Sequence, residues 1–307
     1  MSIGILTRRT LLKDAALALA ASAATTRAAG KLHVACSSYS WDTFYAREKR
    51  SFSASLDDGL ADVARSGLNG FEPGINAPED LVRLTPLLRK HGLEIRSLYV
   101  NSALHKPEEI EASISRVLDI ARKAKGAAGT QIIVTNPSPI RWGGPEDKDD
   151  SQLKTQAAAL DRLGSALRPL GLTLAYHNHD IELRKSAREF HHMMLATNPK
   201  NVTLCLDAHW VYRGCGNSSV ALFDVVKLYG ARISELHLRQ SVANVWSETF
   251  GEGDIDYPAL AAALHKLKLQ PHLVLEQAPE KGTPQTIGPV EIHRLSRQYV
   301  DRVFGAL

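Results

Sequence analysis

The stretch QLKTQAAALDRLGSALRPLGLTLAYHNHD, residues 152–180, holds one complete copy of the pattern that decides the fold. Its first part, Gln152–Leu170, has the spacing of an amphipathic helix, and Gly171 supplies a helix stop. The apolar run Leu172–His177 follows, has the length of a buried strand, and ends in the polar residues 178–180. A helix followed by a buried strand is the unit from which parallel sheets are built.

The same unit recurs on both sides of this stretch. Further apolar runs are Leu32–Cys36, Gly70–Pro73, Glu94–Val100, Gln131–Thr135, Val202–Asp207, Ile233–Leu238 and His272–Glu276. Segments with helical periodicity lie between them, at Leu56–Ser66, Glu79–His91, Glu108–Lys125, Ala187–Ala196, Val220–Tyr229, Tyr257–Leu267 and Val290–Phe304. About eight such units predict an α/β fold of the closed (β/α)8 type, the TIM barrel, which typically needs ~250 residues. An open doubly wound sheet is the alternative, but the residues after the first run, 37–41, lack its glycine-rich turn.

Composition and charge narrow the class of protein. The chain is 44% hydrophobic and 23% charged, which is ordinary for a soluble globular protein. Its net charge of +4 comes partly from the first 31 residues, so the rest is close to neutral and shows no basic stripe for nucleic acid. Three cysteines without a CxxC spacing do not make a disulfide framework. We expect Cys36 and Cys205 to be buried, although a single pair stays open.

The amino-terminal segment has the features of an export signal. Residues 7–13 read TRRTLLK, an alanine-rich apolar stretch follows over 15–24, and small residues lead to Ala29. This resembles a twin-arginine signal peptide. We expect residues 1–29 to be a signal that is removed and residues 30–307 to be a periplasmic or secreted barrel domain, without membrane association after cleavage. An amphipathic first helix of the fold is the alternative.

Ligand-type side chains close the last four apolar runs. These residues are His177, Asp207, His237 and Glu276. In a closed parallel barrel the carboxyl ends of the strands surround one mouth, so we expect the four side chains to converge. Each alone is more often a structural residue, but together they predict a site for a divalent metal ion. Imidazole and carboxylate ligands suit Mn²⁺, Zn²⁺, Co²⁺ or Fe²⁺.

Several motifs, taken in order, resemble those of the xylose-isomerase-like TIM barrels, the group of sugar phosphate isomerases/epimerases. The motifs are Ala175–Asp180, Leu206–Trp210, His237–Arg239, Gly251–Tyr257 and Leu275-Glu276, and the resemblance covers roughly residues 32–304. It implies a divalent metal held by Glu, Asp, His and Glu from strands five to eight.

The chain matches the last three of these ligands with Asp207, His237 and Glu276, and departs at the first. His177 stands where many relatives have glutamate, so the fourth ligand is open between His177, His179 and Glu182. In relatives, two metal-bound glutamates form an acid/base pair that moves a proton next to a carbonyl. Here we expect Glu276 to be one catalytic base, and His179 or His177 to be the other acid/base, because imidazole titrates near neutrality.

Other side chains near the strand ends are candidate substrate contacts. The candidates are Tyr39, Trp41, Glu72, Asn178, Glu182, Trp210 and Arg239. Glu72 is expected to hold a sugar hydroxyl or a catalytic histidine, with a strand-end cap as the structural alternative. Arg239, where relatives often carry lysine, is expected to bind a substrate anion or a neighbouring carboxylate. The aromatic rings either stack on sugar faces or pack in the core.

These features favour a metal-dependent sugar isomerase or epimerase. We expect it to abstract a proton alpha to a carbonyl on a free sugar, cyclitol or glycoside, because phosphorylated sugars are scarce outside the cytoplasm. Beta-elimination on a keto-sugar or 3-keto-glycoside, by a dehydratase or lyase, is the first alternative. A non-catalytic sugar-binding barrel is the second. Near-neutral charge and export disfavour a nuclease, and the protein is expected to act on small molecules. A homo-oligomeric state stays open.

Overall fold

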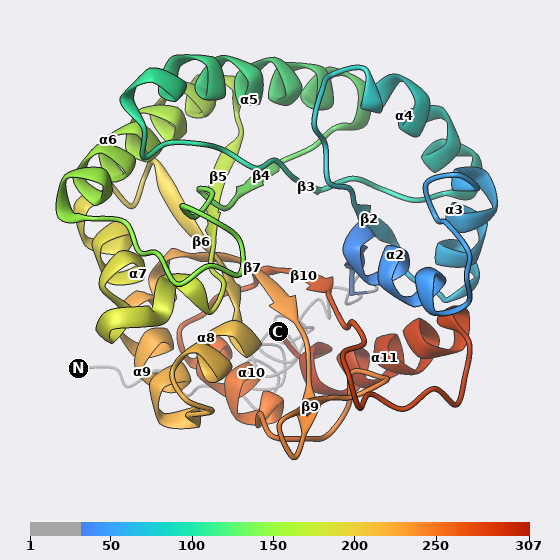
Figure 1. The fold of residues 1–307 in the computed structure, drawn as a ribbon. Coiled ribbons are helices and arrows are strands. Elements are labelled where there is room, and N and C mark those ends of the chain that lie inside the picture. The colour runs from blue at the N-terminus through green and yellow to red at the C-terminus, as the bar shows by residue number, and fades with distance from the viewer. Residues whose placement is uncertain (1–31) are drawn as a thin grey trace, which may run out of the picture. The chain divides into compact units, whose positions relative to one another are not determined.

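The computed structural model describes residues 32–307, of which His33–Leu307 form one compact unit. The expected signal, residues 1–29, lies outside this part of the chain. Eight parallel strands form one sheet in the order β2-β1-β10-β7-β6-β5-β4-β3 (Figure 1). Their bounds are β1 Val34–Ser37, β2 Gly70–Glu72, β3 Ser97–Tyr99, β4 Ile132–Thr135, β5 Thr173–His177, β6 Val202–Asp207, β7 Ile233–Leu238 and β10 His272–Leu275.

The two outer strands of this order, β2 and β3, come together and nearly close the sheet. Gly70 forms a parallel bridge with Glu94, and the Phe71 amide donates to the Glu94 carbonyl at 2.9 Å. The Tyr99 amide donates to the Pro73 carbonyl at 2.9 Å. The predicted TIM barrel is therefore confirmed.

Helices surround the sheet as an outer ring (Figure 1). They are α2 Ser38–Arg47, α3 Leu56–Arg65, α4 Asp80–His91, α5 Pro107–Ala128, α6 Asp150–Leu167, α7 Arg184–Ala196, α8 Ala208–Gly214, α9 Ser219–Tyr229, α10 Tyr257–Lys266 and α11 Pro289–Phe304. A small hairpin, β8 Ser241–Val242 and β9 Val245–Trp246, follows β7. Between Leu32 and Leu307, no helix is both long and apolar enough to cross a bilayer.

Two of these helices, α2 and α8, were not among the segments that the sequence predicted. Each begins directly at a strand end, where a side chain caps it. Ser37 accepts a hydrogen bond from the Ser40 amide, and Asp207 accepts one from the Trp210 amide at 2.8 Å. Side-chain oxygens at this position satisfy amides that have no partner within the helix. Both caps place residues of the short helices at the mouth of the barrel.

Close packing of α6 against the turn before β6 makes a stability prediction. A Cβ added at Gly164 would overlap the carbonyl of Asn201. Gly164→Ala should therefore lower the free energy of unfolding by about 1–3 kcal/mol, the usual cost of overpacking. A urea titration of the wild type and the variant measures this loss. Gly126→Ala is the matched control, because a Cβ at that position of α5 meets no atom within 4 Å. It should raise stability by about 0.5–1 kcal/mol, and equal effects of the two changes would contradict the packing argument.

Candidate active site

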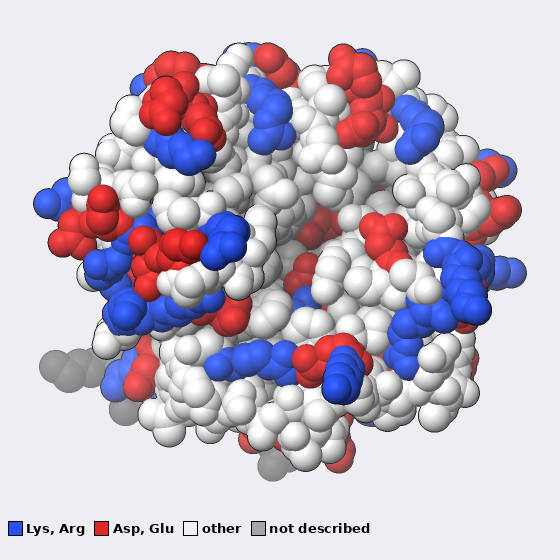
Figure 2. Space-filling model, in the orientation of Figure 1, with Lys and Arg blue, Asp and Glu red and all other residues white. Residues whose placement is uncertain are grey.

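A cavity of about 430 Å³ opens at the carboxyl ends of the barrel strands. Figure 2 shows this hollow, with acidic side chains visible inside it. Its lining residues are Ser37, Ser38, Tyr39, Glu72, Gly74, Tyr99, Asn101, Trp142, His179, Trp210, Arg239 and Glu276. Aromatic walls with a few charged groups at one place are typical of a small-molecule site.

The structure brings the four expected ligand residues together. His177, Asp207, His237 and Glu276 each offer a ligand atom, and these atoms all lie within 4.8 Å of one another. The first two residues end β5 and β6, His237 is the last but one of β7, and Glu276 directly follows β10. Glu276 also lines the cavity, so the four-residue cluster lies directly beneath the cavity.

The unmet hydrogen-bonding capacity of this cluster fits a cation. Asp207 Oδ2, His237 Nδ1 and both ring nitrogens of His177 are buried and make no regular hydrogen bond. Their polar contacts are with one another and with Glu276: His237 Nδ1 lies 3.3 Å from Glu276 Oε2, and His177 Nε2 lies 3.9 Å from Asp207 Oδ2. Such orphaned atoms are rare in folded proteins and require an explanation. Asp207 Oδ1 accepts the hydrogen bond of the α8 cap, and Asp207 Oδ2 is the oxygen that approaches His177. Two imidazoles and two carboxylates are a suitable donor set for a first-row divalent metal.

Two buried carboxylates lie behind His237. Its Nε2 is 3.2 Å from Glu72 Oε1 and 3.2 Å from Glu235 Oε1, while Ser97 Oγ donates to Glu72 Oε2 at 2.8 Å. Burial would raise the pKa of Glu72, but the His237 imidazole lowers it overall. Burial, followed by the charge of Glu72, raises the pKa of Glu235 to about 8. Glu72 therefore contacts the candidate ligand His237 and neither of the expected catalytic histidines, and it also lines the cavity. Glu235, which the sequence did not indicate, contacts the same ring.

Glu276 is held ionised by its neighbours. Arg239 donates from Nη2 to Glu276 Oε2 at 2.9 Å and from Nε to the Glu276 carbonyl at 2.9 Å. Burial opposes ionisation, but His237 and Arg239 lower the pKa of Glu276 well below its usual value. The Arg239 guanidinium in turn lies 4.2 Å from the ring centroid of Trp246 and 5.0 Å from that of Trp210. Arg239 thus binds a neighbouring carboxylate, as one of its expected roles required.

Two histidines of β5 and the loop after it face this carboxylate. Burial lowers the pKa of His179 to about 4, with Glu276 opposing the shift and Arg239 and His237 adding to it. Burial and the neighbouring imidazole of His237 lower the pKa of His177 well below its usual value. The ring of His179 lies 4.7 Å from that of His177 and 5.0 Å from that of Trp142. A neutral imidazole at the cavity wall can accept a proton.

Three expected substrate contacts lie outside the cavity lining. Trp41 is fully buried, donates from Nε1 to Cys36 Sγ at 2.8 Å, and stacks on His293 at 4.0 Å. Its expected contact with substrate is corrected, because α2 turns this ring into the core.

The other two, Asn178 and Glu182, hold backbone in place. Asn178 exchanges hydrogen bonds with the backbone of Asp207, at 3.1 and 3.2 Å. Glu182 accepts hydrogen bonds from the His179 amide at 2.7 Å and from Asn136 Nδ2 at 3.1 Å. Its carboxylate does not join the ligand cluster. Asn178 therefore positions a candidate metal ligand and Glu182 positions a candidate acid/base group, and neither lines the cavity.

Several lining residues escaped the sequence reasoning. Tyr99 ends β3, so a strand-end search could have found it. Trp142 lies in an irregular loop after β4, where no periodicity of the sequence predicts which way a side chain points.

Cys36 and Cys205 are buried and unpaired, and Cys215 is also a free thiol.

Comparisons with known proteins agree with this architecture. Inosose dehydratase from Clostridium perfringens is 25% identical over 272 residues, which cover 78% of this chain and 87% of that protein. Inosose dehydratase from Lacticaseibacillus casei is 24% identical over 281 residues, covering 80% and 89%. The D-allulose 3-epimerase from Methylomonas sp. superposes with a TM-score of 0.66 at 16% identity, covering 89% and 97%. The 3-keto-D-glucoside 4-epimerase from E. coli superposes with a TM-score of 0.62 at 14% identity, covering 89% and 100%.

A family model adds the broadest match. The model described as xylose isomerase-like TIM barrel aligns with residues 60–292, which is more than half of the chain. This span contains the ligand cluster of His177, Asp207, His237 and Glu276. The resemblance noted from the strand-end motifs is thereby confirmed, and the chain belongs to the xylose isomerase-like TIM barrel family.

Proposed function

We propose that this protein is a metal-dependent isomerase or epimerase that moves a proton next to a carbonyl of a sugar, cyclitol or glycoside. The observation that carries the proposal is the position of Glu276, an ionised carboxylate shared by the cavity wall and the ligand cluster. The names of the relatives support this chemistry, since epimerases and dehydratases of this kind both act at carbons beside a carbonyl.

The cofactor in this proposal is one divalent ion, Mn²⁺, Zn²⁺, Co²⁺ or Fe²⁺. His177, Asp207, His237 and Glu276 would hold it, because their atoms converge and several have no other partner. When bound, such an ion supplies Lewis-acid polarisation of a carbonyl oxygen.

The remaining steps belong to the side chains. Glu276 accepts the proton through a carboxylate oxygen, while Arg239 fixes its orientation by two hydrogen bonds. His179, one of the two histidines that the sequence left open, lies on the cavity wall and is the second acid/base group in this proposal. Its imidazole is neutral, with a pKa of about 4 rather than near neutrality, so it takes up a proton from solvent water before it returns one to the face opposite Glu276. Trp210 and Tyr39 offer apolar faces to a sugar ring and help to exclude water.

Beta-elimination is a second candidate because the cluster is short of carboxylates. Only Asp207 and Glu276 of its four members are acidic, and Asp207 also caps α8. A single base that removes a proton without a facing carboxylate to return it favours loss of a leaving group. The relatives named inosose dehydratase point the same way.

Export by the twin-arginine pathway, and with it a periplasmic or secreted location, is part of the proposal. It rests on residues 1–29 alone. A free sugar or glycoside is the substrate class that fits this location. A homo-oligomeric state stays a prediction.

The test is proton exchange. The purified protein loaded with Mn²⁺ is incubated in deuterated water with a panel of free sugars, inosose-type ketones and 3-keto-glycosides. We expect deuterium at the carbon next to the carbonyl, with an epimer or isomer as product. A product that has lost water or an aglycone would identify the eliminating enzyme instead. Sugar binding without exchange by any member of the panel would contradict both and indicate a binding protein.

A further inference from the structure

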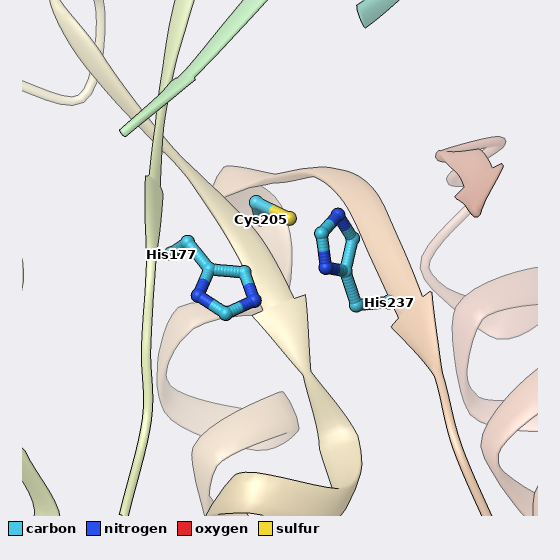
Figure 3. A group of neighbouring side chains, drawn as sticks. All are labelled: His177, Cys205 and His237. Carbon is cyan, nitrogen blue, oxygen red and sulfur yellow. The ribbon is translucent and has the colours of Figure 1, made fainter. Parts of the chain in front are cut away.

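A second group of ligand-type atoms lies one layer deeper in the barrel. Cys205 precedes Asp207 by two residues on β6, so both side chains point to the barrel interior. The Cys205 sulfur and one nitrogen each from His177 and His237 lie within 4.8 Å of one another. Figure 3 shows the sulfur beside the two imidazole rings, with each residue on a different strand.

These three side chains are sealed from solvent and incompletely paired. Cys205 and His237 are 0% exposed and His177 is 1% exposed. Neither nitrogen of His177 has a hydrogen-bond partner, although a buried imidazole without one is costly. The ring of His177 therefore has nitrogen capacity that either group can use, the cluster with Asp207 or the deeper group with Cys205.

Glu235 brings an oxygen to the same layer. Its Oε1 lies 3.5 Å from Cys205 Sγ and 3.2 Å from His237 Nε2, and its Oε2 has no hydrogen-bond partner. A tetrahedral ion with bonds of about 2.3 Å to sulfur and about 2.0 Å to nitrogen or oxygen separates its ligand atoms by roughly 3.3–3.5 Å. The contacts of Glu235 with Cys205 and His237 have this spacing, but the group that also contains His177 does not include Glu235, so this carboxylate adjoins the three ligands.

We propose that Cys205 gives this barrel a second, thiolate-containing binding mode for strongly thiophilic cations such as Cd²⁺. His177, Cys205 and His237 are its ligands, Glu235 lies against the last two, and the thiol proton is released to solvent on binding. His177 and His237 also belong to the cluster with Asp207, so the two modes exclude each other. Oxygen-preferring Mn²⁺ takes the cluster with two carboxylates, whereas thiophilic ions take the deeper one.

Cation binding by the Cys205 group can be tested separately from catalysis. Only its consequence for turnover, competitive loss of Mn²⁺-dependent activity on addition of Cd²⁺, rests on the proposed function. The binding mode itself is tested without substrate. The metal-stripped full-length protein is titrated with Cd²⁺ while the ultraviolet charge-transfer absorption of a cadmium–thiolate bond is recorded.

Cys205→Ser and Cys205→Ala are compared with Cys215→Ser, a control at a free thiol outside the cluster. The wild type and the control should gain the absorption. Both Cys205 variants should lack it and bind Cd²⁺ about 10- to 100-fold more weakly, with Mn²⁺ affinity unchanged. X-ray absorption of the cadmium-bound wild type needs no variant and should show a sulfur neighbour.

Tight Cd²⁺ binding by the wild type without the absorption, or absorption that survives in both Cys205 variants, would overturn the inference. So would an X-ray absorption spectrum with only nitrogen and oxygen neighbours. Failure of the catalytic proposal has a different signature, namely no deuterium exchange with Mn²⁺ while the cadmium–thiolate absorption persists.

Discussion

Glu276→Gln should lower kcat by about 10²- to 10⁴-fold, the range that a positioned acid/base group contributes. The amide keeps the size of the side chain and an oxygen for Arg239, which now donates to Glu276 Oε2 at 2.9 Å. It cannot accept the substrate proton, so the chemical step fails while the cavity keeps its shape. Rates of solvent deuterium uptake into substrate, measured with saturating Mn²⁺, report this step directly.

The control for this change is Glu291→Gln on α11. Glu291 pairs with Arg294 on the surface and does not line the cavity. The Glu291→Gln substitution should leave both kcat and KM close to those of the wild type. Binding of the sugar should survive partly in the Glu276 variant, because the aromatic walls are intact. An exchange rate within about threefold of the wild type would remove Glu276 from the role of catalytic base.

Asp207→Asn should weaken Mn²⁺ binding by about 100-fold without unfolding the protein, since loss of a ligand exceeds the effect of its outer partners. The amide oxygen can still accept the hydrogen bond from the Trp210 amide that caps α8. What disappears is the charge on Oδ2, the atom that faces the cluster and has no hydrogen-bond partner. Isothermal titration calorimetry with Mn²⁺ measures the loss.

The Tm of the metal-free protein is a second readout, and the direction in which Asp207→Asn changes it can be predicted. Burial raises the pKa of Asp207 from 3.8 to about 7. Ionisation is therefore harder in the fold than in the unfolded chain, and the cost grows as pH rises from 3.8 to about 7. The variant lacks this cost, so its metal-free Tm at pH 8 should equal or exceed that of the wild type.

The wild type should instead gain Tm when Mn²⁺ is added, and the variant should not. Asp256→Asn is the matched control, because Asp256 caps α10 in the same way but lies outside the ligand cluster. It should keep the full response to the ion. A normal Mn²⁺ affinity in the Asp207 variant would show that this residue serves only as a helix cap.

Local pattern was sufficient to find the strand ends, and with them most of the candidate site. His177, Asp207, His237 and Glu276 each close an apolar run, and the parallel barrel places such ends around one mouth. The same logic extends to Cys205 and Glu235, which precede two of these residues by two positions and so face inward as well. Both residues lie one layer below the strand ends that carry the four candidate ligands.

Tertiary packing decided what periodicity could not. An aromatic residue near a strand end can face either the cavity or the core. The cap at Ser37 fixes where α2 begins, and with it the direction of each side chain on the helix. As a result Trp41 is buried in the core, whereas Tyr39 lines the cavity. Trp142 reaches the cavity from a loop without periodicity. The ring of His179 gained its neutral state from burial among residues that are distant in sequence.

The sequence by itself determined the repeated units, their order and the chemical groups that end each strand. The reason is that apolar runs and helical spacing depend only on residues that are neighbours along the chain. Only the folded structure decided which of those groups share a cavity, which lack partners and which carry charge. These properties depend on burial and on contacts between strands far apart along the chain, and a linear pattern does not contain them.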